Sequence, residues 1–75
     1  MKYKVGDKVR IREDLEPGKR YGGLTLLGGY MSGQRGKTGY VTTICLFDCC
    51  LIDITNGYIW SEEMLEPVKN FNSLE

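Results

Sequence analysis

The stretch GKTGYVTTICLF, residues 36–47, is the longest strand-like segment of the 75-residue chain, and the remaining residues are expected to pack onto it. The β-branched and aromatic residues between Thr38 and Phe47 favour a β-strand. Val41 and Ile44 lie three positions apart, although side chains on one face of a strand recur at every second residue. If both belong to the core, the strand carries a β-bulge or a sharp bend, as the corners of small barrels require.

The segment before this stretch, residues 5–13, predicts another strand. Its apolar and basic residues alternate, which is typical of a strand with one buried face. Val9 and Ile11 are expected to face the core. The basic residues around them are expected to face solvent: Lys8, Arg10 and Arg12.

A long first loop, residues 14–38, separates these two strands, and single and paired glycines interrupt any regular pattern in it. A loop of about 25 residues without structure is unusual in a compact domain. Its apolar residues are therefore expected to fold back over one end of the core. We expect a helical turn near residues 25–31.

The second half of the chain predicts a hairpin. Asp48 is expected at a tight turn into a strand over residues 49–55, where alternation places Cys50 in the core and Cys49 outside it. Asn56-Gly57 is a strong signal for a two-residue turn at the end of this strand. The next strand then runs back along the first one.

The register of this hairpin decides which residues are buried. The two-residue turn would place Asp53 opposite Trp60, and opposed residues share a sheet face. The isoleucines would then line the core: Ile52, Ile54 and Ile59. Tyr58 and Trp60 would lie on the other face, beside Leu51. A slip of one residue reverses this assignment, so the sequence leaves open whether Tyr58 and Trp60 are exposed or buried.

The end of the domain predicts a single helical turn, of the 3-10 type, and a last strand. Ser61 can cap the turn, and the two glutamates that follow suit its amino end. Residues 65–68 form the expected last strand, with Pro67 at a sheet edge or at the end of the domain. The sequence therefore predicts one domain over residues 1–68 and a tail over residues 69–75.

This order of elements resembles an SH3-like barrel, with five strands, a long first loop and one 3-10 turn before the last strand. The pattern Gly36-Lys37-x-Gly39-x-Val41 is similar to the loop-and-strand signature of KOW-type SH3-like domains. The ending WSEEMLEP, residues 60–67, with Tyr21-Gly22-Gly23 upstream, resembles small proteins of phages and prophages of Gram-positive bacteria. The resemblance implies an all-β, five-stranded barrel that binds another molecule and originates in a mobile element. It supplies no catalytic residues.

Composition and motifs argue against enzymatic, metal-binding and nucleotide-binding classes. Three cysteines without any histidine do not provide the four ligands of a structural zinc site in the usual spacing. The segment Gly36-Lys37-Thr38 lacks the preceding glycine of a phosphate-binding loop, because Met31 occupies that position. Without histidine, a nucleophile has few candidate bases. We expect a protein that is not an enzyme and uses no metal and no cofactor.

The expected location is the cytoplasm. Lys2 and Lys4 are followed by no apolar signal-peptide segment, and the longest apolar run of four residues cannot span a membrane. The cysteines are odd in number, and the neighbours Cys49 and Cys50 are poor disulfide partners. Reduced thiols of this kind are typical of cytoplasmic proteins.

Two sets of residues are candidate binding surfaces. The first is a basic row that either contacts the phosphates of a nucleic acid or pairs with carboxylates of the protein itself: Lys8, Arg10, Arg12, Arg35 and Lys37. Ten basic and ten acidic residues cancel in this chain, which favours the second reading slightly. The other is an aromatic set that either anchors a partner or completes a small core: Tyr21, Tyr30, Tyr40, Tyr58 and Trp60.

These expectations combine into a non-catalytic binding module. It would contact a host or phage protein through the loop between Tyr21 and Tyr40 and the face of Tyr58 and Trp60, and so inhibit or adapt a host factor. The alternative is a nucleic-acid-binding module that uses the basic row and aromatic stacking. We expect a monomer or a weak homo-oligomer that pairs through its edge strand at residues 65–68.

Overall fold

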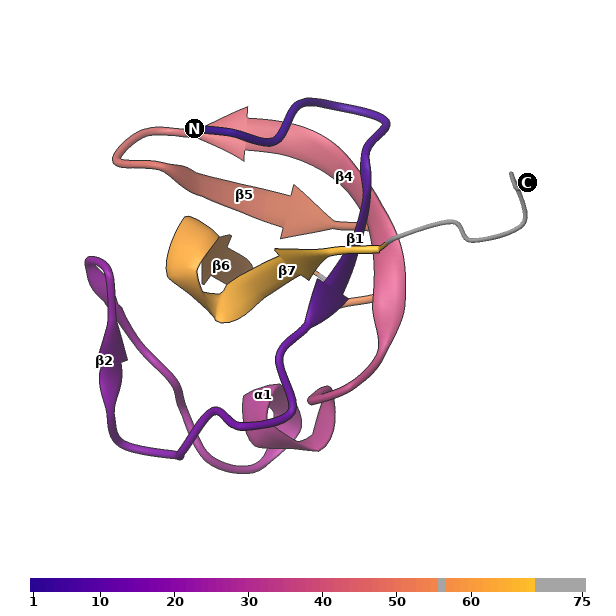
Figure 1. Cartoon of the computed structure of the whole chain (residues 1–75). Coiled ribbons are helices and arrows are strands. Elements are labelled where there is room, and N and C mark those ends of the chain that lie inside the picture. The colour runs from indigo at the N-terminus through magenta and orange to yellow at the C-terminus, as the bar shows by residue number, and fades with distance from the viewer. Residues whose placement is uncertain (56, 69–75) are drawn as a thin grey trace.

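The computed structural model describes residues 1–55 and 57–68, and its main feature is a five-stranded antiparallel sheet (Figure 1). The strand order is β6-β5-β4-β1-β7, so β6 and β7 are the two edges. A 3-10 helix, η1 (Glu62–Met64), connects these edges, as the sequence predicts. The expected all-β class is confirmed. The five strands are β1 (Lys8–Ile11), β4 (Thr38–Cys45), β5 (Cys49–Ile52), β6 (Ile59–Ser61) and β7 (Leu65–Pro67).

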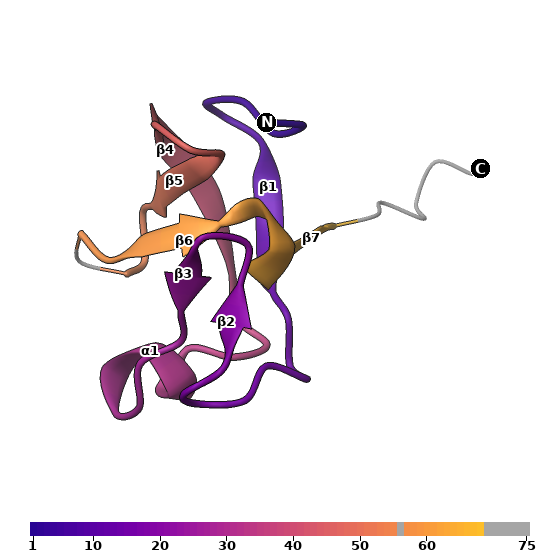
Figure 2. The same cartoon turned by 90° about the vertical axis from the view of Figure 1, so that its left-hand side faces the viewer.

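The long first loop contains a hairpin that the sequence pattern does not predict. Strands β2 (Arg20–Tyr21) and β3 (Leu24–Thr25) pair with each other, and α1 (Tyr30–Gly33) follows them (Figure 2). The Leu26 amide extends the hairpin by donating to the Lys19 carbonyl at 2.9 Å. The helical turn expected near residues 25–31 lies slightly further along the chain. The glycines of this loop therefore mark turns of a folded segment.

The core is formed by the inner face of the sheet and by apolar residues of the first loop. Val9 and Ile11 of β1 are buried while Lys8 is exposed, which confirms the predicted alternation. The first loop covers one end of this core, as expected. The core residues are Tyr3, Val9, Ile11, Leu15, Leu26, Met31, Val41, Cys50, Ile52, Trp60, Met64 and Leu65.

Strand β4 is bent (Figure 1), and its pairing with β5 shifts register between Val41 and Thr43. The predicted bulge is thus confirmed, and Val41 is buried. The bulge places Ile44 opposite Cys50, on the same face as Val41, but Ile44 lies near the end of the strand and is exposed rather than part of the core. The strand is also two residues shorter than expected, since residues 46–48 form the turn into β5.

Gly39 marks a close approach between β4 and the end of β5. A Cβ atom at this position would lie 2.6 Å from Cγ2 of Ile52 and 2.7 Å from Oδ1 of Asp53. We expect Gly39→Ala to lower the free energy of unfolding by about 1–3 kcal/mol through overpacking. Urea unfolding followed by circular dichroism measures this. The control is Gly23→Ala, whose Cβ meets no atom within 4 Å; equal effects of the two variants would contradict the prediction.

The register between β5 and β6 differs from the expected one. Trp60 opposes Cys50 instead of Asp53, which is a shift of three residues. A shift by an odd number exchanges the two faces of a strand. Trp60 is therefore fully buried, and the reading of an exposed Trp60 is wrong. Ile52 lies in the core as predicted, whereas the other two isoleucines are exposed: Ile54 and Ile59.

The segment between β5 and β6 explains this shift. The Thr55 amide donates to the Ile52 carbonyl at 3.2 Å, and the Tyr58 amide donates to the Thr55 carbonyl at 3.0 Å. Two successive turns thus replace the expected end of the strand, and Thr55 is buried. Its Oγ1 accepts a hydrogen bond from Nε1 of Trp60 at 3.0 Å, which satisfies the buried indole. Asn56 of the predicted turn lies outside the described residues.

Ser61 does not cap η1. Its hydroxyl donates to the carbonyl of Tyr21 at 2.7 Å, which ties the β2–β3 hairpin to the end of β6. The predicted tail, residues 69–75, lies outside the described residues. In residues 1–55 and 57–68, no helix has the length and apolar character needed to cross a membrane.

Candidate functional site

The basic row predicted on β1 is held by acidic and backbone groups of the protein. Nη2 of Arg10 lies 2.9 Å from Oε1 of Glu13, and Nη1 lies 3.7 Å from Oε2 of Glu66. Nε of the same guanidinium donates to the carbonyl of Gly36 at 3.2 Å. Arg10 therefore connects β1 to β7 and to the end of the first loop.

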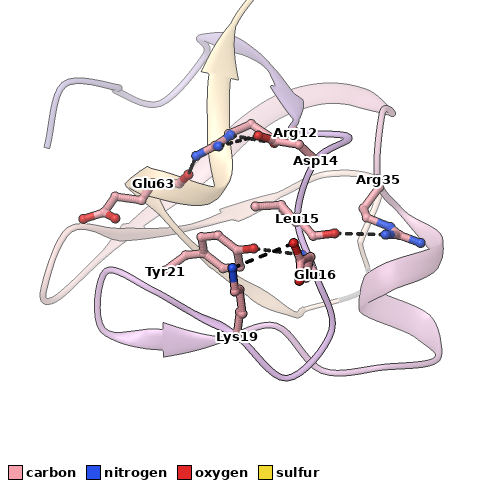
Figure 3. A network of polar contacts seen from close by, with 8 residues as sticks. All are labelled: Arg12, Asp14, Leu15, Glu16, Lys19, Tyr21, Arg35 and Glu63. Atoms are coloured by element: carbon pink, nitrogen blue, oxygen red, sulfur yellow. Dashed lines mark hydrogen bonds and ion pairs between the residues drawn. The ribbon is translucent and has the colours of Figure 1, made fainter.

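The other two arginines of the row also make internal contacts (Figure 3). Arg12 donates to both carboxylate oxygens of Asp14, at 3.0 and 2.8 Å, and to the carbonyl of Glu63 at 2.8 Å. This hydrogen-bonded guanidinium lowers the pKa of Asp14 below its ordinary value. Arg35 donates to the carbonyls of Ser32 and Leu15, at 2.7 and 2.9 Å. The three arginines of the basic row therefore hold parts of the protein together. Lys8 and Lys37 are the remaining members of the row, and both are exposed.

The five aromatic residues predicted as one binding surface are dispersed. Tyr30 and Tyr58 stack with ring centroids 4.7 Å apart. The hydroxyl of Tyr21 accepts a hydrogen bond from the Glu16 amide at 2.8 Å (Figure 3). Tyr40 is exposed on β4, where the Lys8 ammonium lies 6.0 Å from its ring centroid. With Trp60 in the core, the structure brings only Tyr30 and Tyr58 together.

A different apolar surface covers the outer face of β4, β5 and β6. Because opposed residues share a face, the register aligns two rows on it: Thr43, Leu51 and Ile59 in one, and Cys45, Cys49 and Ser61 in the other. The core residues Cys50 and Trp60 occupy the opposite face. Cys49, predicted to lie outside the core, is on this outer face but is nonetheless buried.

An apolar groove lies beside the edge strand β6, between this outer face and Leu24 of the β2–β3 hairpin. We call it the β6 groove; it has a volume of about 510 Å³ and is lined by Leu24, Cys45, Leu46, Phe47, Cys49 and Ile59. A second hollow of about 460 Å³ shares Leu24 and Ile59 with it and reaches Leu27 and Tyr58. The two form a continuous apolar surface that runs from the β4–β5 turn to the neighbourhood of α1.

The β4–β5 turn at the end of the groove combines backbone strain with apolar exposure. Phe47 and Asp48 have φ of 62° and 57°, in the left-handed region. An aspartate is enriched there, but a bulky residue such as phenylalanine is an outlier. The side chains of Leu46 and Phe47 are 78% and 88% exposed. The Glu62 amide donates to the Asp48 carbonyl at 2.9 Å, which holds the turn from the side of η1.

The sequence pattern does not predict this groove, because it places Leu24 in a loop over the core and Leu46 and Phe47 in a strand. One local signal nevertheless points to it. Leu46 and Phe47 directly precede Asp48, the predicted turn residue, whereas turns are normally built from glycine, asparagine, aspartate, serine and proline. Two large apolar residues beside a turn depart from this usual composition.

The three cysteines are free thiols. Cys50 is in the core as predicted, and burial raises the pKa of its thiol to about 11. Among the described residues, no group of three or more cysteine, aspartate or glutamate side chains is placed to hold a metal ion.

Comparisons of this chain with protein families, with curated proteins and with solved structures find no match.

Proposed function

We propose that this protein is a non-catalytic binding module that holds an apolar segment of a partner protein in the β6 groove. The observation that carries the proposal is Phe47, which is 88% exposed and has a φ of 62°. A left-handed backbone costs about 1–2 kcal/mol for a residue with a side chain, and asparagine or glycine would tolerate it better. Such strain clusters at functional sites.

The form of the groove suggests an extended partner segment. The groove is almost wholly apolar and lies beside β6, an edge strand of the sheet. Extended peptides commonly bind by adding to a sheet edge, with pockets for alternate side chains. Phe47 and Ile59, both exposed, would contact apolar side chains of such a segment.

The fold and origin belong to the same proposal. The order of β1, a long first loop, three paired strands, η1 and β7 supports an SH3-like barrel. We propose that the protein comes from a phage or prophage, acts in the cytoplasm of the host cell, and inhibits or adapts a host factor. The resemblance of residues 60–67 to small phage proteins supports this origin.

The experiment is a selection of binding peptides from a displayed random library, followed by amide NMR titration of the full chain. We expect selected peptides to carry apolar residues at alternate positions and to shift resonances of Leu24, Phe47 and Ile59. Tyr40 is the internal control, because it is exposed outside the groove. Peptides whose shifts avoid the groove, or a selection that yields no binder, would refute the proposal.

The same titration tests nucleic-acid binding. We expect a flat response to short single- and double-stranded nucleic acids at low salt, because the arginines of the basic row are engaged within the protein. Shifts that gather on Lys8 and Lys37 and vanish at near-physiological salt would instead establish the nucleic-acid function.

A further inference from the structure

Cys45 and Cys49 stand opposite each other at the base of the β4–β5 turn. Directly opposed residues of an antiparallel pair have Cα atoms about 4.5 or 5.5 Å apart, depending on their hydrogen bonding. A disulfide requires a Cα separation of about 4.4–6.8 Å. Either kind of opposed pair therefore falls within the range in which two cysteines can be joined without moving the strands apart.

Cys50 is excluded from this pair by its place in the sheet. It opposes Ile44 on β4 and Trp60 on β6, so its side chain lies on the core face. It is also fully buried. Adjacent residues point to opposite faces of a strand, which separates its thiol from that of Cys49. The register thus selects one pairing among the three that three cysteines allow.

The two thiols differ in access to solvent. Both line the β6 groove, but Cys45 is half-buried, whereas Cys49 is buried and its Sγ donates to the Phe47 carbonyl at 3.3 Å. Burial raises the pKa of the Cys49 thiol above its ordinary value, so Cys49 stays protonated at neutral pH. An oxidant that enters from solvent therefore meets Cys45 first.

We propose that Cys45 and Cys49 form an oxidant-modified dithiol site, at which hydrogen peroxide generates an intramolecular disulfide. The Cys45 thiol releases its proton, and the resulting thiolate attacks one peroxide oxygen. The O–O bond breaks, the departing hydroxide takes up the released proton as water, and Cys45 becomes a sulfenic acid. The Cys49 sulfur then attacks the Cys45 sulfur, the S–O bond breaks, and a second water leaves with the Cys49 proton. Two thiols are oxidised by two electrons, and the peroxide is reduced to two waters.

This site does not depend on the function proposed above, although it adjoins the same groove. The disulfide would close residues 45–49 into a small ring that contains Phe47. Cytoplasmic disulfides are usually transient and serve redox sensing. Formation of the bond is measurable on the isolated chain without any partner.

The test treats the folded full chain at low concentration with hydrogen peroxide, then unfolds it and alkylates the remaining thiols. We expect a mass lower by about 2 Da before alkylation, from the loss of two hydrogens, and one alkylated thiol of the three. Chymotrypsin cleaves after Phe47, so the peptides carrying Cys45 and Cys49 remain joined only through the disulfide. Fragmentation mass spectrometry should place the alkyl group on Cys50.

Two variants control the assignment. Cys50→Ala should form the bond as the parent does, whereas Cys49→Ala should form none and leave a Cys45 sulfenic acid that dimedone traps. The parent protein provides an answer that does not depend on the folding of either variant. A bond that includes Cys50, a cross-link between chains, or three unmodified thiols would overturn the proposal.

Discussion

Trp60→Ala is expected to leave the protein largely unfolded or only marginally stable at 25 °C. Trp60 is fully buried and is the largest of the fully buried side chains. Truncating a buried tryptophan to alanine costs about 3–5 kcal/mol through lost contacts and the cavity left behind. A domain of 75 residues has a total stability of roughly 4–11 kcal/mol. The substitution therefore removes a large share of the stability.

Urea unfolding followed by far-ultraviolet circular dichroism measures this loss. Thr55→Val is the companion variant, because it removes the Oγ1 that accepts the indole hydrogen bond at 3.0 Å and keeps the tryptophan. We expect it to cost about 1–3 kcal/mol, since the buried N–H is left without a partner. A cooperative Trp60→Ala transition within about 1 kcal/mol of the parent would contradict the buried position of Trp60.

Phe47→Asn is expected to stabilise the fold and to abolish binding of peptides in the β6 groove. Asparagine tolerates the left-handed backbone that Phe47 adopts, and two consecutive positive φ values are typical of tight hairpin turns rich in asparagine and glycine. We expect the free energy of unfolding to rise by about 1 kcal/mol, because the strain is relieved. Few substitutions of an exposed aromatic residue are expected to raise the free energy of unfolding.

Phe47→Asn should weaken peptide binding although it stabilises the fold. Aromatic anchors at interfaces cost about 2 kcal/mol or more when removed, which corresponds to an affinity loss of roughly 30-fold. Titration calorimetry with a selected peptide measures it. Tyr40→Ala is the matched control, since Tyr40 is 49% exposed but lies outside the groove. This variant should bind the selected peptide with the affinity of the parent protein. An unstable Phe47→Asn protein, or one that binds normally, would remove Phe47 from the site.

Several features of the fold could be predicted from local patterns alone. Val9 and Ile11 alternate with basic residues, so the buried face of β1 follows from the period of a strand. The bulge in β4 follows from the spacing of its apolar residues, whereas the exposure of Ile44 near the end of the strand does not. The β2–β3 hairpin cannot be predicted in this way, because its strands are two residues long, too short to display any alternation.

The candidate site was harder to predict, because it depends on which face of each strand is covered. The aromatic set shares only its residue type, and its members lie in the core, in the first loop, on β4 and just before β6. The β6 groove instead joins Leu24 to Phe47 and Ile59, which lie on three separate segments. Residue type could only indicate that Leu46 and Phe47 are unusual beside a turn.

The sequence by itself determined the all-β class, the succession along the chain of the five strands that form the main sheet, the 3-10 turn before the last of them and which side chains of β1 are buried; it did not predict the two further strands, β2 and β3. These features depend on side-chain period and turn chemistry within a few residues. Only the tertiary structure decided the register of β5 against β6, and with it the burial of Trp60 and the exposure of Ile59. It also decided the register of β4 against β5, which places Cys45 opposite Cys49. The physical reason is that side chains alternate between the two faces of a strand, so a register shift of three residues exchanges the buried face with the exposed one. The shift itself follows from the inward turn of Thr55 and its hydrogen bond to Trp60.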